Sequence, residues 1–305
     1  MADALRIALA CCRATPTAQR HDLYPDPDSE LLADRFRAQG VEAQLVSWDN
    51  EQVDWTGFDA VVLRSTWDDV DRPVEYLQWV HAIDDLTTLH NPAAIVEWNI
   101  DKTYLRDLAA VGVPTIPTQW IAPGDSWLGE TQPSGQFIVK PSIGSGARST
   151  ARYAAGSCAA ATEHISALGA QGQTVMVQDY FASVEDAGET SITFIAGQAT
   201  HAVRKGAFLN VDEGVIDTPW ERMTFLGRCE PTDTQMTIAT NAFAIVQSRC
   251  TRIHPGRTLL YGRVDLIDDP SGNPVVIEVE LIDPQLSLRD APESADLLAS
   301  AIVEL

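Results

Sequence analysis

The chain has 305 residues, of which 45% are hydrophobic, so it is long enough for two or three compact units with substantial cores. Its net charge of −22 at pH 7 argues against a nucleic-acid or anionic-membrane partner, because both attract a basic surface. Five cysteines without zinc-type or Cys-x-x-Cys spacing indicate a reduced, cytoplasmic protein.

The first part of the chain contains three strand-like runs. Residues 5–12 form an apolar run that is too short for a signal peptide or a membrane span, and we predict a strand there. Further strands are predicted at residues 41–46 and 59–63. A polar, proline-bearing loop is predicted from Arg13 to Asp28.

Two helices are predicted around these strands, and each has a start signal. Asp28 and Ser29 are predicted to cap the first helix, which Gly40 closes. Pro73 is predicted to begin the second helix, whose expected apolar face consists of Val74, Leu77, Val80 and Ile83. The order of strands and helices predicts a small Rossmann-like α/β sheet.

Ligands of such sheets lie beyond the carboxyl ends of the strands. This rule places Arg13 and the segment 63–68 at a predicted substrate mouth. Arg64 is equally suited to a loop salt bridge and to binding a substrate carboxylate. The candidate substrate residues are therefore Arg13, Arg64, Ser65 and Thr66.

The rest of the chain begins at a boundary formed by Asn91 and Pro92. A helix ending at Ala110 is predicted next, capped by Asn99 or Asp101, with Lys102 in its first turn. The remaining predicted elements are strands at 137–139 and 175–178, helices at 159–168 and 234–249, a β-rich part at 190–204, and a terminal hairpin of residues 259–267 and 275–281.

A loop rich in glycine and serine follows the predicted strand at 137–139. The strand delivers Lys140, and the loop that follows can bring backbone amides close to phosphate oxygens. The loop lacks the Gly-Lys-Ser/Thr ending of a Walker A sequence. A strand followed by such a turn is commonly plain structure, so a phosphate site requires supporting residues elsewhere.

Three carboxylates of the terminal hairpin supply that support. Because side chains alternate along a strand, Asp265 shares a face with Arg263, and Glu278 shares a face with Glu280. A hairpin makes the two strands neighbours, so the three carboxylates can converge on a cation, and hard oxygen ligands suit Mg²⁺. A solvated sheet face is the alternative, and the phosphate loop in the same chain favours the metal site.

These motifs, in this order, resemble those of the ATP-grasp ligases, with glutathione synthetase as the nearest well-known relative. The resemblance covers residues 91–305 by motif and the N-terminal part in architecture only. It implies a mixed α/β (α+β) fold with three parts: a Rossmann-like substrate domain (1–90), a central subdomain with a glycine-rich lid (91–181), and a C-terminal antiparallel-sheet subdomain with the metal site (182–305). It also implies ATP and Mg²⁺, expected as two ions with Mn²⁺ as an alternative, and a homo-oligomer, either a dimer or a tetramer.

The resemblance assigns roles residue by residue. The residues similar to the family's nucleotide-binding set are Lys102, Lys140, Ser142, Gly144, Ser145, Gly146, Gln178, Asp179, Tyr180, Phe181 and Glu189. In that set the two lysines hold the phosphates, the loop closes over them, residues 178–181 contact adenine, and Glu189 binds ribose.

The same comparison implies the catalytic and metal-binding residues. Arg204 resembles the basic residue near the γ-phosphate, with Lys205 assisting it, and Arg263 is expected to steady the acyl phosphate or the tetrahedral intermediate. Asp265 and Glu278 resemble the magnesium ligands. Glu280 stands where the family has Asn, and a glutamate there can still coordinate Mg²⁺.

A narrower resemblance is to the cycloserine synthetases, the ATP-grasp cyclo-ligases that act on O-ureido-serine. It rests on the segments 63–68, 101–108 and 201–206 and on Glu280 and Leu281 before Asp283. It implies that a small amino-acid-like carboxylate is activated as an acyl phosphate and joined to nitrogen in antibiotic biosynthesis. A ligase that joins two small amino acids or modifies a peptide end is the first alternative, and a nucleotide-binding regulator without turnover is the second.

Overall fold

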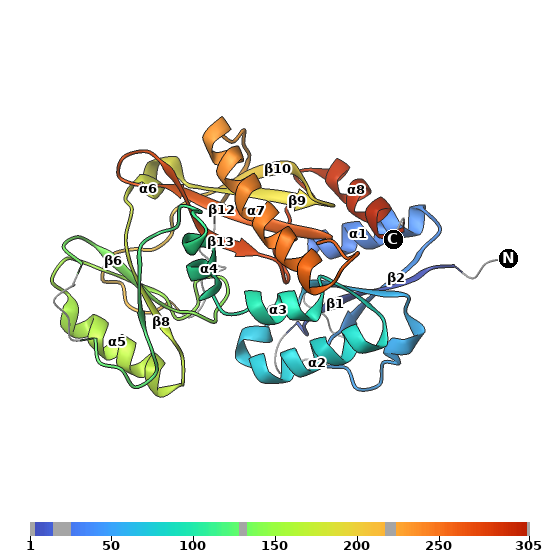
Figure 1. The fold of residues 1–305 in the computed structure, drawn as a ribbon, viewed down its shortest axis with the longest axis horizontal. Helices are drawn as coiled ribbons and strands as arrows, with labels where there is room; N and C mark the ends of the chain where they lie inside the picture. Colours follow the sequence, from blue (N-terminus) through green and yellow to red (C-terminus); the bar gives the residue numbers. More distant parts are fainter. Residues whose placement is uncertain (1–3, 15–25, 128–132, 217–223, 304–305) are drawn as a thin grey trace.

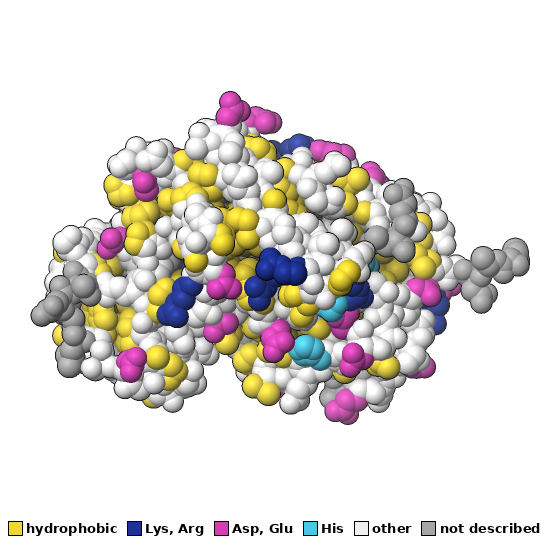
Figure 2. Space-filling model, viewed as in Figure 1, with side chains coloured by type: hydrophobic (Ala, Val, Ile, Leu, Met, Phe, Trp, Pro, Cys, Tyr) yellow, Lys and Arg dark blue, Asp and Glu magenta, His cyan; other side chains and the backbone are white. Residues whose placement is uncertain are grey.

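The structure is a computed structural model that describes residues 4–14, 26–127, 133–216 and 224–303 and arranges them around three β-sheets (Figure 1). Most of the loop predicted after Arg13 lies outside these residues. Every helix in the described ranges is too short or too polar to cross a lipid bilayer. On the face shown in Figure 2, basic side chains are concentrated near the centre and acidic ones are scattered.

The N-terminal sheet is parallel and has the strand order β2-β1-β3-β4, which confirms the predicted Rossmann-like part. Its hydrophobic central strands β1 and β3 are buried on both faces, as parallel strands under helices require. The strands and the helices around them are β1 (Arg6–Cys11), α1 (Pro27–Ala38), β2 (Glu42–Ser47), η1 (Trp55–Gly57), β3 (Ala60–Ser65), η2 (Asp69–Asp71), α2 (Pro73–Leu86), β4 (Thr88–His90) and α3 (Ala93–Asn99).

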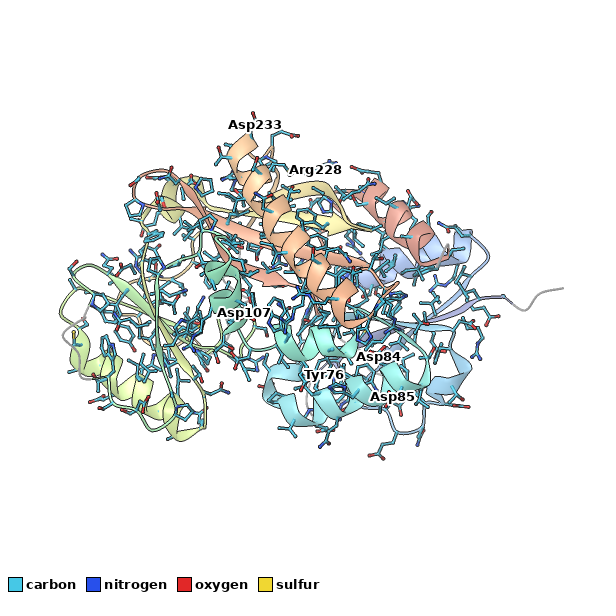
Figure 3. All side chains as sticks on the ribbon, in the orientation of Figure 1. Tyr76, Asp84, Asp85, Asp107, Arg228 and Asp233 are labelled. Atoms are coloured by element: carbon cyan, nitrogen blue, oxygen red, sulfur yellow. The ribbon has the colours of Figure 1, made fainter. Side chains whose placement is uncertain are left out.

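Two details of these helices differ from the prediction. The side chain of Asp26 caps α1 by accepting a hydrogen bond from the Asp28 amide at 3.1 Å, so Asp28 and Ser29 lie inside the first turn. On α2, labelled in Figure 3 at Tyr76, that tyrosine is fully buried while Val74 is 71% exposed. The buried face is therefore rotated toward Tyr76, because Trp48 packs edge-on against its ring at 5.3 Å.

The second sheet is antiparallel, with the strand order β5-β8-β6-β7, and α5 packs on one of its faces. The elements of this stretch of the chain are α4 (Tyr104–Ala110), β5 (Thr118–Ile121), β6 (Phe137–Pro141), β7 (Ala151–Tyr153), α5 (Cys158–Ala170) and β8 (Val175–Asp179), of which α4 packs outside the core of this sheet. Lys102 was predicted in the first turn of the helix that ends at Ala110. It lies instead in the turn between α3 and α4, because the segment after Asn91 forms two short helices.

The third sheet is also antiparallel, with the order β11-β10-β9-β12-β13. Helix α7 crosses it, begins at a Thr232–Gln235 capping box next to Asp233, and buries Phe243 against Phe194 (Figure 3). The elements of this part are α6 (Ser183–Ala187), β9 (Glu189–Ile195), β10 (Gln198–Lys205), β11 (Phe225–Arg228), α7 (Asp233–Ile253), β12 (Tyr261–Asp268), β13 (Pro274–Glu280) and α8 (Pro292–Val303).

The last helix returns to the N-terminal sheet. Helix α8 packs against α1, and Leu298 and Ile302 share a core with Leu32 and Phe36 (Figure 1). The two ends of the chain therefore build one hydrophobic core. The division at residues 90 and 181 stays a prediction.

Candidate active site

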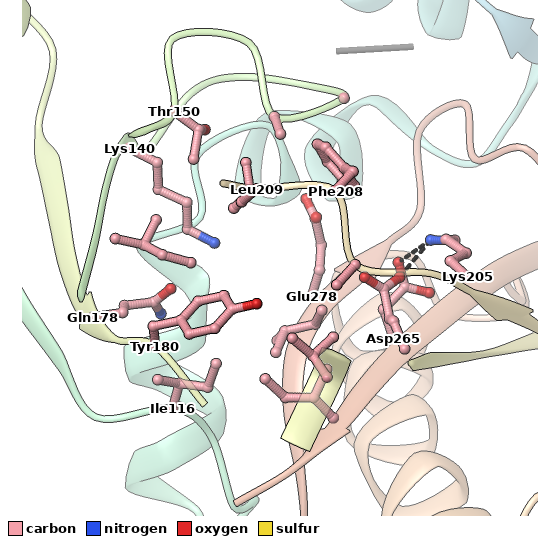
Figure 4. A pocket seen from close by; sticks show the side chains of 18 of the residues that line it. Ile116, Lys140, Thr150, Gln178, Tyr180, Lys205, Phe208, Leu209, Asp265 and Glu278 are labelled. Atoms are coloured by element: carbon pink, nitrogen blue, oxygen red, sulfur yellow. Dashed lines mark hydrogen bonds and ion pairs between the residues drawn. The ribbon is translucent and has the colours of Figure 1, made fainter. Parts of the chain in front are cut away.

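A cavity of about 210 Å³ lies between the second and the third sheet. Figure 4 shows the Lys140 ammonium group on one wall and the Asp265 and Glu278 carboxylates on the other, all facing the same space. The sequence-predicted residues that line it are Lys102, Lys140, Gly144, Gly146, Gln178, Asp179, Tyr180, Phe181, Glu189, Lys205, Arg263, Asp265, Glu278 and Glu280. The structure thus brings most of the predicted nucleotide, metal and catalytic residues together.

The hairpin of β12 and β13 places the three carboxylates as strand alternation predicts. Arg263 lies opposite Glu280 in the register and Asp265 lies opposite Glu278. One oxygen of each carboxylate lies within 4.8 Å of an oxygen of the other two. The three carboxylates therefore form one group that opens into the cavity.

Cationic side chains neutralise this group. Arg263 donates to both oxygens of Asp265 at 2.8 Å and to Glu280 at 2.5 Å. Lys205 binds Asp265 at 3.0 Å, and Lys102 lies 3.0 Å from Glu278. Burial alone would raise the pKa of Asp265, but Arg263 and Lys205 hold it below its usual range.

Lys140 has a different environment from the other cations. Burial lowers the pKa of its ammonium group to about 8, because the nearby Glu278 charge only partly offsets the loss of water. Among the described residues, no carboxylate forms an ion pair with Lys140. Lys140 is therefore the cation of this cavity that an anionic ligand can contact without displacing a protein carboxylate.

Buried side chains hold the free edge of β13, where the cluster sits. Asn99 donates to the Val279 carbonyl at 2.8 Å and accepts from the Leu281 amide at 2.9 Å. The Tyr104 hydroxyl accepts from the Val279 amide at 2.8 Å. These groups replace a neighbouring strand, so the backbone on both sides of Glu280 has fixed partners.

The glycine loop between β6 and β7 forms part of the cavity wall through Gly144 and Gly146. The Lys102 side chain donates to the Gly144 carbonyl, and its amide donates to the Ser142 carbonyl at 2.9 Å. Ser142 is fully buried, so its predicted contact with phosphate is not supported: its backbone ties the loop down. Ser145 faces a second cavity instead.

Arg204 also differs from the prediction. Its guanidinium donates to the Ala187 carbonyl at 2.5 Å, and it is not among the described residues that line either cavity. Because side chains alternate along β10, the neighbouring Lys205 points into the cavity, where it binds Glu189 at 2.5 Å. Lys205 is therefore the basic residue of this strand that can approach a phosphate.

The second cavity, of about 970 Å³, adjoins the first and lies against the N-terminal sheet. The two cavities share a wall that consists of Lys102, Gly144, Gly146, Arg148, Arg263, Glu278 and Glu280. Arg13 lines the second cavity, as predicted for a substrate residue, and binds Asp49 at 2.6 Å.

The other three predicted substrate residues are buried behind this cavity. Arg64, Ser65 and Thr66 are fully buried, and none is among the described residues that line either space. Arg64 lies 5.5 Å from the centre of the Tyr261 ring and donates to the Pro284 carbonyl at 3.3 Å. Arg64, Ser65 and Thr66 are inaccessible because β3 is a central strand and the segment that follows β13 covers its end.

Comparison with known proteins identifies the family. Residues 7–91 match the profile described as "D-cycloserine synthetase DcsG, N-terminal domain". The chain is 35% identical over 286 residues to "Cycloserine biosynthesis protein DcsG" of Streptomyces lavendulae, covering 92% of this chain and 94% of that protein. The chain belongs to the D-cycloserine synthetase family.

Solved structures agree with this assignment to the D-cycloserine synthetase family. The crystal structure of D-cycloserine synthetase DcsG matches with a TM-score of 0.86 at 32% identity, covering 98% of this chain and 99% of that chain. D-alanine–D-alanine ligase from Bacillus anthracis matches with a TM-score of 0.64 at 14% identity, over 99% and 97%, and shows the shared fold. The synthetase is an ATP-dependent ligase with the ATP-grasp fold, which confirms the predicted family, fold class and enzyme class.

Some residues of the synthetase site were missed by sequence reasoning. Apolar side chains line the first cavity beside residues 178–181, and Ile138 among them has a signal, because it lies two positions before Lys140 on the same strand face. The other apolar residues of this wall are Ile116, Val184, Phe208, Leu209, Ile267 and Ile277. In the second cavity the missed residues include Asp69 to Arg72, which come from a segment without a recognisable motif. Trp67 and Asp68 belong to the segment predicted at the substrate mouth, and Asp283 entered only as part of a motif, without a role.

Proposed function

We propose that this enzyme forms an amide bond between the carboxylate of a small amino-acid-like substrate and a nitrogen atom of the same molecule. The specific substrate that we propose is O-ureido-serine. One observation carries the proposal: the charged side chains of the wall that the two cavities share are three cations and two carboxylates, namely Lys102, Arg148, Arg263, Glu278 and Glu280. A phosphoryl donor on one side and a carboxylate acceptor on the other would meet there. The relationship to "Cycloserine biosynthesis protein DcsG" supports the choice of substrate.

ATP would occupy the smaller cavity. The apolar wall with Ile138 and the backbone of residues 178–181 suit an adenine ring, and Lys140 and Lys102 suit the phosphates. Glu189 is proposed to bind the ribose, and in the structure its carboxylate accepts a hydrogen bond from Lys205 at 2.5 Å. Nucleotide binding would therefore require Lys205 to change partners.

The residues of the hairpin also fit Mg²⁺. Three carboxylates with converging oxygens are the ligands that a hard cation prefers, so we assign Asp265, Glu278 and Glu280 to magnesium and propose two ions. When bound, magnesium would neutralise charge on the phosphates. Arg263 and Lys102, which form ion pairs with these carboxylates, would then be available to phosphate oxygens.

The chain's own residues would favour the ligase reaction in three ways. A carboxylate becomes a good acylating group only as an acyl phosphate, and Arg263 faces both cavities at the point where this group would form. The glycine loop would exclude water from it. In the cyclising reaction the attacking nitrogen is already attached to the substrate, so the larger cavity has only to fold it.

The experiment is to measure ADP release with O-ureido-serine and to identify the product by mass spectrometry. The proposal predicts ADP and a cyclic product from this compound alone. ADP release only with pairs of amino acids or with peptide acceptors would favour an intermolecular ligase. Nucleotide binding without ADP release under all these conditions would favour a regulator. The proposed homo-oligomer is tested by light scattering on the same sample.

A further inference from the structure

Six acidic side chains line the larger cavity, and they fall into two groups. Four of them have a basic partner within ion-pair distance, in the pairs Asp68–Arg72, Asp71–Arg148, Glu278–Lys102 and Glu280–Arg263. The other two are Asp69 and Asp283. Among the described residues, no lysine, arginine or histidine lies within ion-pair distance of either carboxylate.

Asp69 and Asp283 come from distant parts of the chain but face the same cavity. Asp69, which begins η2, is 4% exposed, and its side chain accepts one hydrogen bond, from the Val70 amide at 2.7 Å. Asp283 follows β13 and accepts from the Thr66 hydroxyl at 2.8 Å. Neither carboxylate therefore receives a hydrogen bond from a lysine, arginine or histidine of the described residues.

A buried carboxylate and a partly buried one that face the same cavity without a cation are an unfavourable arrangement. Burial, followed by repulsion from Asp283, raises the pKa of Asp69 well above its usual range. Burial also raises the pKa of Asp283 to about 6, although Thr66 and the charge of Arg64 oppose the shift. A positively charged group placed between Asp69 and Asp283 would therefore be favourable.

We propose that Asp69 and Asp283 form a subsite for the ammonium group of the substrate. The proposal deepens and rests on the proposed function, since an amino-acid-like substrate carries this group one carbon atom away from its carboxylate. Lys102 of the shared wall is also among the charges that act on Asp69. An ammonium group held by the two aspartates thus leaves the carboxylate next to the wall where it would be phosphorylated.

The test compares O-ureido-serine with its analogue that lacks the α-amino group, in the wild type and in Asp69→Asn, Asp283→Asn and Asp68→Asn. Asp68→Asn is the matched control, because Asp68 lines the same cavity but has Arg72 as its partner. The wild type should prefer the amino compound by at least roughly 100-fold in kcat/KM. Asp69→Asn and Asp283→Asn should each reduce that preference by at least roughly tenfold, and the control should keep it within about twofold.

The ratio of kcat/KM for the two compounds separates recognition of the amino group from a general loss of activity, because a folding defect lowers the turnover of both compounds alike. A wild type that accepts both compounds equally, or Asp69→Asn and Asp283→Asn variants that keep the full preference, would overturn the subsite. Calorimetric binding of both compounds with the ATP analogue AMPPNP present tests the subsite without turnover. A binding preference without ADP release would support the subsite and contradict the proposed reaction, whereas equal binding would contradict the subsite alone.

Discussion

The Asn99 amide offers a sharp test of how the edge of β13 holds the site. Substitution by alanine removes the donor to the Val279 carbonyl and the acceptor of the Leu281 amide, and both backbone groups are buried. Each unsatisfied buried group costs about 1–3 kcal/mol, so Asn99→Ala, which leaves two of them, should lower the free energy of unfolding by about 2–6 kcal/mol. Because the two groups flank Glu280, kcat should also fall in protein that is still folded.

Urea denaturation followed by tryptophan fluorescence measures the first effect, and ADP release well below the melting temperature measures the second. Asn50→Ala is the control, because that side chain accepts one hydrogen bond, from the Gln52 amide at 3.1 Å, in an exposed turn. It should cost less than about 0.5 kcal/mol. A loss below about 1 kcal/mol in Asn99→Ala, with kcat unchanged, would refute the idea that this side chain substitutes for a neighbouring strand.

Three further predictions concern single residues. Lys140→Met should lower ADP release roughly 100- to 1,000-fold, and near-normal turnover would refute the assignment of Lys140 to the phosphates. Asp71→Asn removes the half-exposed ion pair that ties Arg148 of the glycine loop to η2, so the KM for ATP should rise roughly two- to fivefold, and an unchanged KM would contradict this role. Burial lowers the pKa of His90 to about 4, so its neutral form is favoured in the folded state and stability should fall as pH drops below about 6.5. Between pH 7 and pH 5 the wild type should lose about 2 kcal/mol more than His90→Gln in urea denaturation, and equal losses would exclude this contribution.

The sequence predicted those parts of the site in which the alternation of side chains along one strand decides which residues face the cavity. The hairpin of β12 and β13 follows from two alternating runs and a Pro-Ser-Gly turn, and the three carboxylates converge as expected. The register, with Asp265 opposite Glu278, is known from the structure alone. Lys140 faces the cavity for the same reason, because it ends a strand whose apolar residues, Phe137 and Val139, are buried. The alternation of side chains along a single strand was enough to predict both features.

The errors arose where a contact between distant segments decides which side chain is accessible. Arg64 follows a buried strand, as predicted, but the segment after β13 covers it, and no local pattern reveals a contact over 220 residues. Arg204 and Lys205 are adjacent basic residues, so composition could not tell which of the two faces the cavity. Asp69 and Asp283 were missed because each alone resembles a solvated aspartate, and only the fold places them together.

Glu280, the third carboxylate of the hairpin, has a consequence for nucleotide binding. Glu280 stands where the family has Asn. Arg263 lies directly opposite Glu280 on the neighbouring strand, and the two side chains form an ion pair at 2.5 Å. With it, the carboxylates of Glu189, Asp265, Glu278 and Glu280 balance the cations Lys102, Lys140, Lys205 and Arg263. A neutral, partly buried cluster offers no net attraction to the several negative charges of free ATP. Positive charge must therefore enter together with the nucleotide, which is why binding to this site should depend more steeply on magnesium than binding to a site with Asn at this position.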